Sequence, residues 1–316
     1  MYLFFASASS MGIPDVRENP KPDWTCNPFQ TITLPGKLRK PKALAANSFP
    51  VVRALVQRGK GGVYQAIDLQ SNPPRLCLLK EGRRHGEMSW DGRDGAWRVR
   101  NEERVLSRLS RSGIKVPQVY SRFQVDGNVY LAMEFVEGES LQTLLLRKKR
   151  RLSVRRVLSL GIEIATFLAQ MHRAGWAWRD CKPKNLIVSR DGNLVPIDFE
   201  GASPIKNPDP VRWGTGAFIP IESGRRSVPS AVNDDLFALG STLYLLITGR
   251  VFNHEQRVPI DKLRRKVPPA LRRLVELLLG SEPRKRPSAH SAQHQLNSIL
   301  LNYSEPPLRL AVSKAA

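Results

Sequence analysis

The sequence predicts an α+β protein with two lobes, a small antiparallel β lobe followed by a larger helical lobe. Two observations predict this fold. Strand-like runs dominate residues 49–135, and a single helical stretch interrupts them. After Gly138 apolar residues recur at helical spacing instead. A cleft between two such lobes is the expected place for a ligand.

The smaller lobe is predicted to cover residues 51–136 and the larger lobe residues 137–302. In the smaller lobe the expected strands cover 51–56, 62–68, 75–80, 120–125 and 129–135. A Gly127-Asn128 turn joins the last two of them, and a helix is expected over 98–110. In the larger lobe Ser153 is a favourable N-cap for the first long helix. Further helices are expected over 234–248, 269–279 and 288–300.

Residues 1–50 are predicted to form a Pro-rich extension and residues 303–316 a tail. Six prolines break any long element in the extension, at positions 14, 20, 22, 28, 35 and 41. Met11 is an alternative start of the chain.

Composition favours a folded protein of the reducing cytoplasm. The chain has 316 residues with 41% hydrophobic content, which supports a buried core. Its three cysteines, Cys26, Cys77 and Cys181, are too widely separated to indicate a disulfide framework or a zinc site. No membrane span is expected, because the apolar stretch 236–247 is short and flanked by charges.

The net charge of +22 results from 50 basic residues against 28 acidic ones. Such a surface attracts polyanions. The densest basic run, residues 147–151, has two interpretations, a solvated loop or a docking site for an acidic substrate. Specific binding of nucleic acid is not expected, because aromatic residues are not interleaved with this run and no nucleic-acid-binding motif is present.

Residues 178–185, Trp-Arg-Asp-Cys-Lys-Pro-Lys-Asn, have the residue types and spacing that phosphoryl transfer needs. Asp180 can accept the proton of an attacking hydroxyl. Asn185 and Asp198 can hold Mg²⁺ against the phosphates of ATP. Between them, two strand-like runs flank an Asp-Gly turn, which predicts a hairpin that returns Asp198 close to Asn185.

These segments resemble the catalytic loop (H-R-D-L-x-x-x-N) and metal loop (D-F-G) of protein kinases. Trp178 replaces the usual His, where an aromatic ring can serve the same packing role, and Glu200 replaces the usual Gly. The resemblance implies that Asp180 and Lys182 are catalytic, with Lys182 neutralising charge on the transferred group. A Lys at this position is typical of Ser/Thr kinases.

The resemblance also implies an ATP site in the smaller lobe. Lys80 would contact the α- and β-phosphates, held by Glu102 or, one residue along, by Glu103. Backbone groups of Glu134 and Val136 would bind adenine. A glycine-rich turn, shorter than the usual one, would cover the phosphates; its residues are Gly59, Gly61, Gly62 and Val63.

Three features of the larger lobe match the family as well. Glu222 is expected to pair with Arg286, and Asp235 to brace the backbone of the catalytic loop. Thr215 could bond Asp180 and Lys182. The first two features separate protein kinases from aminoglycoside- or choline-type phosphotransferases.

A narrower resemblance is to the kinase domain of class III and class IV lanthipeptide synthetases. It rests on the shortened glycine turn, the Gly/Asp-rich insert at 91–96 and the Asp-Phe-Glu at 198–200. That family phosphorylates Ser and Thr of a precursor peptide before eliminating phosphate and cyclising. Only the kinase part is carried over, because the sequence has no room for the family's lyase and cyclase domains.

The sequence therefore predicts an ATP- and Mg²⁺-dependent kinase that acts on Ser or Thr of a protein or peptide, with a precursor peptide and an acidic peptide as candidates. Two alternatives stay open. One is a catalytically silent nucleotide-binding scaffold, in which Glu200 and Trp178 mark lost activity. The other is a polyanion-binding protein built on the same fold.

Overall fold

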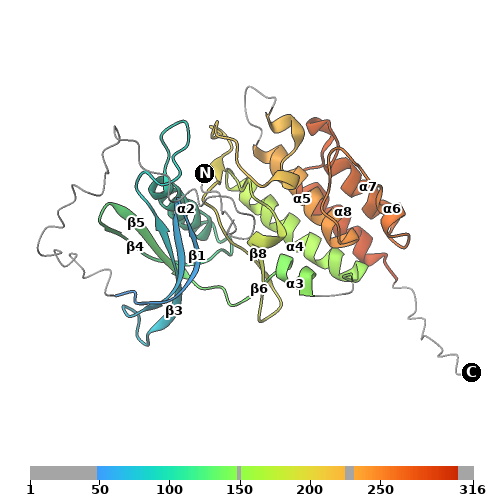
Figure 1. Ribbon diagram of the computed structural model, residues 1–316. Helices are drawn as coiled ribbons and strands as arrows, with labels where there is room; N and C mark the ends of the chain where they lie inside the picture. The colour runs from blue at the N-terminus through green and yellow to red at the C-terminus, as the bar shows by residue number, and fades with distance from the viewer. Residues whose placement is uncertain (1–47, 148–150, 225–230, 305–316) are drawn as a thin grey trace, which may run out of the picture. The chain divides into compact units, whose positions relative to one another are not determined.

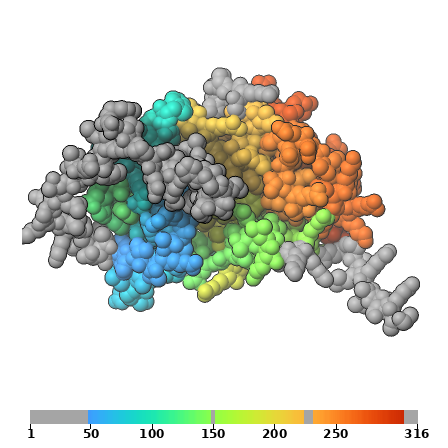
Figure 2. Space-filling model, viewed as in Figure 1, coloured from blue at the N-terminus to red at the C-terminus, as the bar shows by residue number. Residues whose placement is uncertain are grey.

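The computed structural model describes residues 48–147, 151–224 and 231–304. The predicted extension up to residue 47, the centre of the basic run and the tail beyond residue 304 lie outside these ranges. The predicted α+β fold with two lobes is confirmed: one lobe is built on a five-stranded antiparallel sheet and the other on helices (Figure 1). In a space-filling view the smaller lobe, coloured blue to green, adjoins the larger lobe, coloured yellow-green to red (Figure 2).

The sheet of the smaller lobe has the strand order β1-β2-β3-β5-β4. Its strands are β1 (Val51–Arg58), β2 (Gly61–Asp68), β3 (Arg75–Gly82), β4 (Val119–Val125) and β5 (Asn128–Glu134). Helix α2 (Gly95–Arg111) packs against β3 and β5. Asp94 caps it by accepting a hydrogen bond from the backbone N–H of Trp97 at 2.8 Å. Val105, Leu106 and Leu109 form its fully buried face.

The larger lobe is organised around α4 (Val154–Arg173), which packs on α5 (Ala231–Thr248) and α8 (Ala289–Leu301). Ser153 caps α4 as predicted, accepting from the N–H of Arg156 at 3.1 Å. A Cβ at Gly161 would lie 2.8 Å from Leu243 and 3.3 Å from Leu296, so glycine lets the three helices approach closely. α7 (Pro269–Leu278) and the short α6 (Ile260–Leu263) complete this side.

Several short strands and one short helix lie in the larger lobe, beside the cleft between the lobes. The predicted hairpin is present as β8 (Leu186–Ser189) and β9 (Leu194–Pro196), and β6 (Gly138–Ser140) adds a third strand. β6, the following α3 (Leu141–Arg147) and the β7–β10 pair (Trp176–Ala177 with Ser203–Pro204) were not predicted, because they are too short for a periodic pattern. No helix in the described ranges is long and apolar enough to span a bilayer.

Candidate functional site

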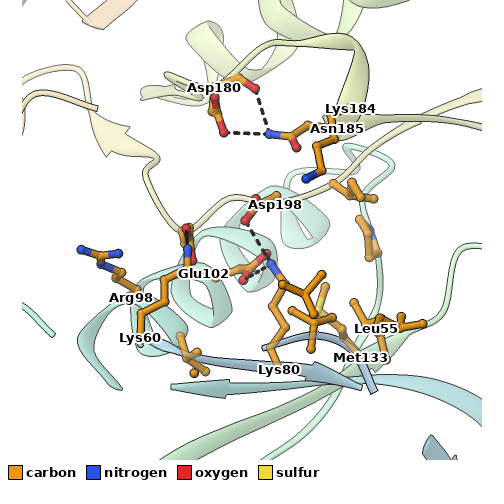
Figure 3. Close-up of a pocket in the computed structure, with 18 of the residues that line it drawn as sticks. Leu55, Lys60, Lys80, Arg98, Glu102, Met133, Asp180, Lys184, Asn185 and Asp198 are labelled. Atoms are coloured by element: carbon orange, nitrogen blue, oxygen red, sulfur yellow. Dashed lines mark hydrogen bonds and ion pairs between the residues drawn. The ribbon is translucent and has the colours of Figure 1, made fainter. Parts of the chain in front are cut away.

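A cavity of about 580 Å³ lies between the sheet and the helical lobe. Its lining comes from β1 to β3, from α2, from the β5–β6 connection and from the loops around Asp180 and Asp198 (Figure 3). Every candidate site residue predicted from the sequence lines this cavity except Gly59. That glycine lies in the turn between β1 and β2, against the side chain of Glu87.

The glycine-rich segment is a two-residue turn, because Arg58 pairs directly with Gly61 across the hairpin. Gly61 has a φ of 147°, and a Cβ on it would lie 1.8 Å from the carbonyl oxygen of Glu81. Glycine is therefore required by both conformation and space. Gly61, Gly62 and Val63 follow the turn into β2 and line the cavity.

Lys80 connects three parts of the site (Figure 3). Its Nζ donates to both carboxylate oxygens of Glu102 at 2.7 Å and to Oδ1 of Asp198 at 3.0 Å. Burial works to lower the pKa of Lys80, but the carboxylates of Asp198 and Glu102 outweigh it, so the pKa is raised. Glu102, rather than Glu103, is the partner, because Glu103 instead pairs with Arg122 at 2.6 Å.

Asp180 is held by three side chains. Its carboxylate accepts from Lys182 Nζ at 2.7 Å, from Asn185 Nδ2 at 2.9 Å and from Thr215 Oγ1 at 3.1 Å. Thr215 in turn accepts from Lys182 at 2.6 Å. Burial raises the pKa of Asp180, with Lys182 and Asn185 opposing the shift. Such a buried, oriented carboxylate is suited to act as a general base.

The loop that carries Asp180 is anchored by the side chain of Asp235, which is fully buried. Its carboxylate accepts from the backbone N–H groups of Trp178 at 2.9 Å and Arg179 at 2.6 Å, and it contacts His172 at 2.8 Å. Arg179 has a φ of 71°, a conformation costly for a residue with a side chain. Asp235 therefore braces the backbone of the catalytic loop, as predicted, and the backbone that it holds is strained at Arg179.

Trp178 fills the position expected for a smaller ring. Its indole stacks on Phe199 at a centroid distance of 5.6 Å and meets Phe167 edge-on at 5.5 Å. Its Nε1 donates to the carbonyl oxygen of Asp198 at 3.0 Å. The packing role expected of an aromatic residue is therefore fulfilled, with an added hydrogen bond to the neighbouring loop.

Asp198 and Asn185 come together as the hairpin predicted, since the N–H of Ile197 donates to the carbonyl oxygen of Asn185 at 2.9 Å. The amide nitrogen of Asn185 is engaged by Asp180, which leaves its side-chain oxygen for a cation. Burial works to raise the pKa of Asp198, but Lys80 and other nearby cations lower it, so its carboxylate is ionised at neutral pH. A carboxylate and an amide oxygen are ligands suited to Mg²⁺.

The opposite end of the cavity is apolar, with Leu55, Leu78 and Met133 among its lining residues. The connection after β5 passes beside it. There the backbone N–H of Glu134 donates to the carbonyl oxygen of Gln118 at 2.8 Å, so that N–H is already engaged. Val136 lines the same edge. A flat heterocycle fits this combination of apolar walls and backbone groups.

Lys60, Arg98 and Lys184 also line the cavity and were not singled out from the sequence. Lys60 forms an ion pair with Glu200 across the cavity. Arg98 pairs with Glu87 at 3.5 Å and lies 5.1 Å above the ring of Trp213. Lys184 points into the cavity from the catalytic loop (Figure 3). Two of them could have been found from the sequence. Lys60 lies between two glycines of the turn, and Lys184 directly precedes Asn185.

The segment after Asp198 is held by ion pairs as well. Asp209 pairs with Arg93, next to α2, and lies 3.8 Å from Arg179 of the catalytic loop. At the end of the segment Glu222 pairs with Arg286, as predicted. These contacts fix the chain that carries Thr215.

Comparison with known proteins gives one consistent family. Residues 57–296 match the model of the protein kinase domain. The chain is 30% identical over 220 residues to 3-phosphoinositide-dependent protein kinase 1 of Arabidopsis thaliana, covering 61% of this chain and 43% of that protein. It is 25% identical over 288 residues to serine/threonine-protein kinase D of Synechocystis sp., covering 85% and 55%. Serine/threonine-protein kinase PknA of Nostoc sp. is 27% identical over 282 residues, covering 84% and 49%. The chain therefore spans about half the length of these relatives.

Replacing Asp235 should test how strongly the catalytic loop depends on this one carboxylate. Asp235→Ala is expected to lower the free energy of unfolding by about 3 kcal/mol, because buried N–H donors lose their acceptor. Chemical denaturation measures the change. Asp261→Ala is the matched control: its side chain is 54% exposed and its contact with Arg272 is 3.6 Å long, so a change under about 0.5 kcal/mol is expected. Equal losses in both variants would contradict the bracing role.

Proposed function

Because the chain belongs to the protein kinase family, we propose that it transfers the γ-phosphoryl group of ATP to a Ser or Thr hydroxyl of a protein or peptide. One observation carries the proposal. The groups that bind phosphate, hold a cation and accept a proton line one cavity, already linked by hydrogen bonds. Preorganisation of this kind is the main source of catalysis in phosphoryl transfer.

Each candidate residue has a distinct part in this proposal. Asp180 orients the acceptor hydroxyl and receives its proton. Lys182 lies beside Asp180 and neutralises charge on the transferred group. Lys80, oriented by Glu102, positions the phosphates of ATP. The backbone of Gly61, Gly62 and Val63 borders the phosphate end of the cavity, and that of Glu134 and Val136 borders the adenine end.

Asn185 and Asp198 would hold Mg²⁺, which supplies positive charge against the phosphates. The geometry favours an active enzyme over a silent scaffold. Glu200 points its carboxylate to Lys60, and Trp178 supports the loop that carries Asp198. Neither departure from the family motif removes a group that the reaction needs.

We propose an acidic peptide as acceptor, with a precursor peptide as one candidate class. Arg58 and Lys184 lie at the cavity and form no ion pair with any described residue, whereas Lys60, Lys80, Arg98 and Lys182 all do. An acceptor with carboxylates near its Ser or Thr would complement these two cations. The narrower likeness to lanthipeptide synthetase kinase domains, whose substrates are precursor peptides, is part of this proposal.

A reducing cytoplasm is the proposed location. Cys77 and Cys181 are free and buried, and burial raises the pKa of the Cys77 thiol to about 11. Such thiols are protonated at neutral pH and unreactive.

Asp180→Asn tests the proposed reaction. It keeps the size of the side chain but removes the proton acceptor, so phosphate transfer should fall by at least about 100-fold. Incorporation of label from ATP with Mg²⁺ measures it, on a generic basic protein and on acidic peptides rich in Ser and Thr. Asp126→Asn, in the exposed β4–β5 turn, is the matched control and should keep full activity. Bound ATP with no transfer by wild type would instead support the scaffold.

Lys184→Glu tests the choice of acceptor. The ratio of kcat/KM for an acidic over a basic peptide should fall by about fivefold, because an exposed ion pair contributes up to about 1 kcal/mol. Lys262→Glu, on the exposed face of α6, changes the net charge equally and should leave the ratio unchanged. A similar shift in both variants would mean that overall charge, rather than this site, selects the peptide.

A further inference from the structure

We propose that Lys60 binds the phosphates of the nucleotide through its side chain, and that Glu200 is the counter-ion that holds Lys60 in place until the nucleotide enters. This inference rests on the proposed function for the identity of the ligand. It concerns Lys60, in the shortened glycine-rich turn over the cavity, and Glu200, which stands where the family pattern has Gly.

The position of Lys60 follows from the turn that carries it. Its carbonyl oxygen accepts from the N–H of Arg83 at 2.8 Å. A Cβ on Gly95 would lie 1.9 Å from the same oxygen, so the start of α2 packs directly against the turn. The backbone of Lys60 is therefore held from two sides, and its side chain is the part that can move.

Glu200 is held equally well on the other side of the cavity. The side chain of Asn101, on α2, donates to the carbonyl oxygen of Glu200 at 3.1 Å and to that of Ala202 at 2.9 Å. The neighbouring Gly201 has no room for a Cβ, which would lie 1.9 Å from the indole nitrogen of Trp213. The ion pair between Lys60 and Glu200 thus joins two rigid backbones through two flexible side chains.

The balance of charge explains why a phosphate would displace Glu200. Lys80 already contacts Glu102 and Asp198, and Glu200 lies nearby on Lys60, so a polyphosphate that reaches Lys80 meets three carboxylates. Lys60 is a second cation at this point of the cavity, and its side chain is 24% exposed against 14% for that of Glu200. A polyphosphate carries several negative charges, so it attracts the ammonium of Lys60 more strongly than the single charge of Glu200 does. Lys60 gains by exchanging its partner, and Glu200 moves away from the incoming charge.

The role of Lys60 is tested by measuring nucleotide binding in the absence of a peptide acceptor. This measurement does not depend on phosphoryl transfer, so an inactive enzyme would still give a result. Titration calorimetry should compare ATP with adenosine, which lacks phosphates. Lys60→Met is expected to weaken ATP binding about tenfold and leave adenosine within twofold, because it removes a charge-assisted bond. Lys60→Arg should recover most of the affinity. Arg53→Met is the charge-matched control, on an exposed position of β1 outside the cavity lining, and should bind both ligands as wild type does.

Glu200→Gln supplies the second arm. ATP should bind about threefold more tightly once the competing carboxylate is gone, and the gain should vanish in the Lys60→Met background because the two residues act as a pair. Equal weakening of ATP and adenosine by Lys60→Met would overturn the proposal in favour of a pair that only shapes the cavity. Weaker binding of ATP to Glu200→Gln, seen with Mg²⁺ and absent without it, would overturn it in favour of Glu200 as a metal ligand.

Discussion

The site depends on one buried carboxylate, Glu102, whose side chain is fully inaccessible to solvent. A buried charge must be paired, and removing one partner typically costs several kcal/mol. Glu102 meets this requirement with Lys80 from β3 and with the backbone N–H of Phe199, which donates to it at 3.1 Å. Glu102 thereby ties β3, α2 and the loop of Asp198 together through one side chain. The cavity lies where these three parts meet.

Asp235 is a second buried carboxylate on which the site depends, and it holds the catalytic loop in place. Both are carboxylates without solvent contact that accept backbone N–H groups of functional loops. The aromatic cluster of Phe167, Trp178 and Phe199 lies between the two loops and packs them together. The larger indole at 178 is accommodated because its nitrogen finds a carbonyl oxygen, so the substitution keeps the support rather than weakening it.

Much of the fold and of the cavity lining could be predicted from the sequence. The periodic strands and helices lie within a few residues of their expected ranges, and the Asp-Gly hairpin alone brings Asp198 to Asn185. The choice between Glu102 and Glu103 could not be made from the sequence. Neighbouring side chains on a helix point about 100° apart around its axis, and only the packing of α2 decides which of the two is buried. The pair of Lys60 and Glu200, 140 residues apart, has no local signal. The proposed lobe boundaries and residue roles stay predictions.

The contact of Asp209 with Arg93 and Arg179 needs no covalent modification of the chain to form. A carboxylate written into the chain cannot be added or removed by another enzyme, as a phosphate can. The segment that carries Thr215 is therefore drawn against the catalytic loop from the moment the polypeptide folds. The charge that Asp209 places beside Arg93 and Arg179 is therefore present without any modifying enzyme.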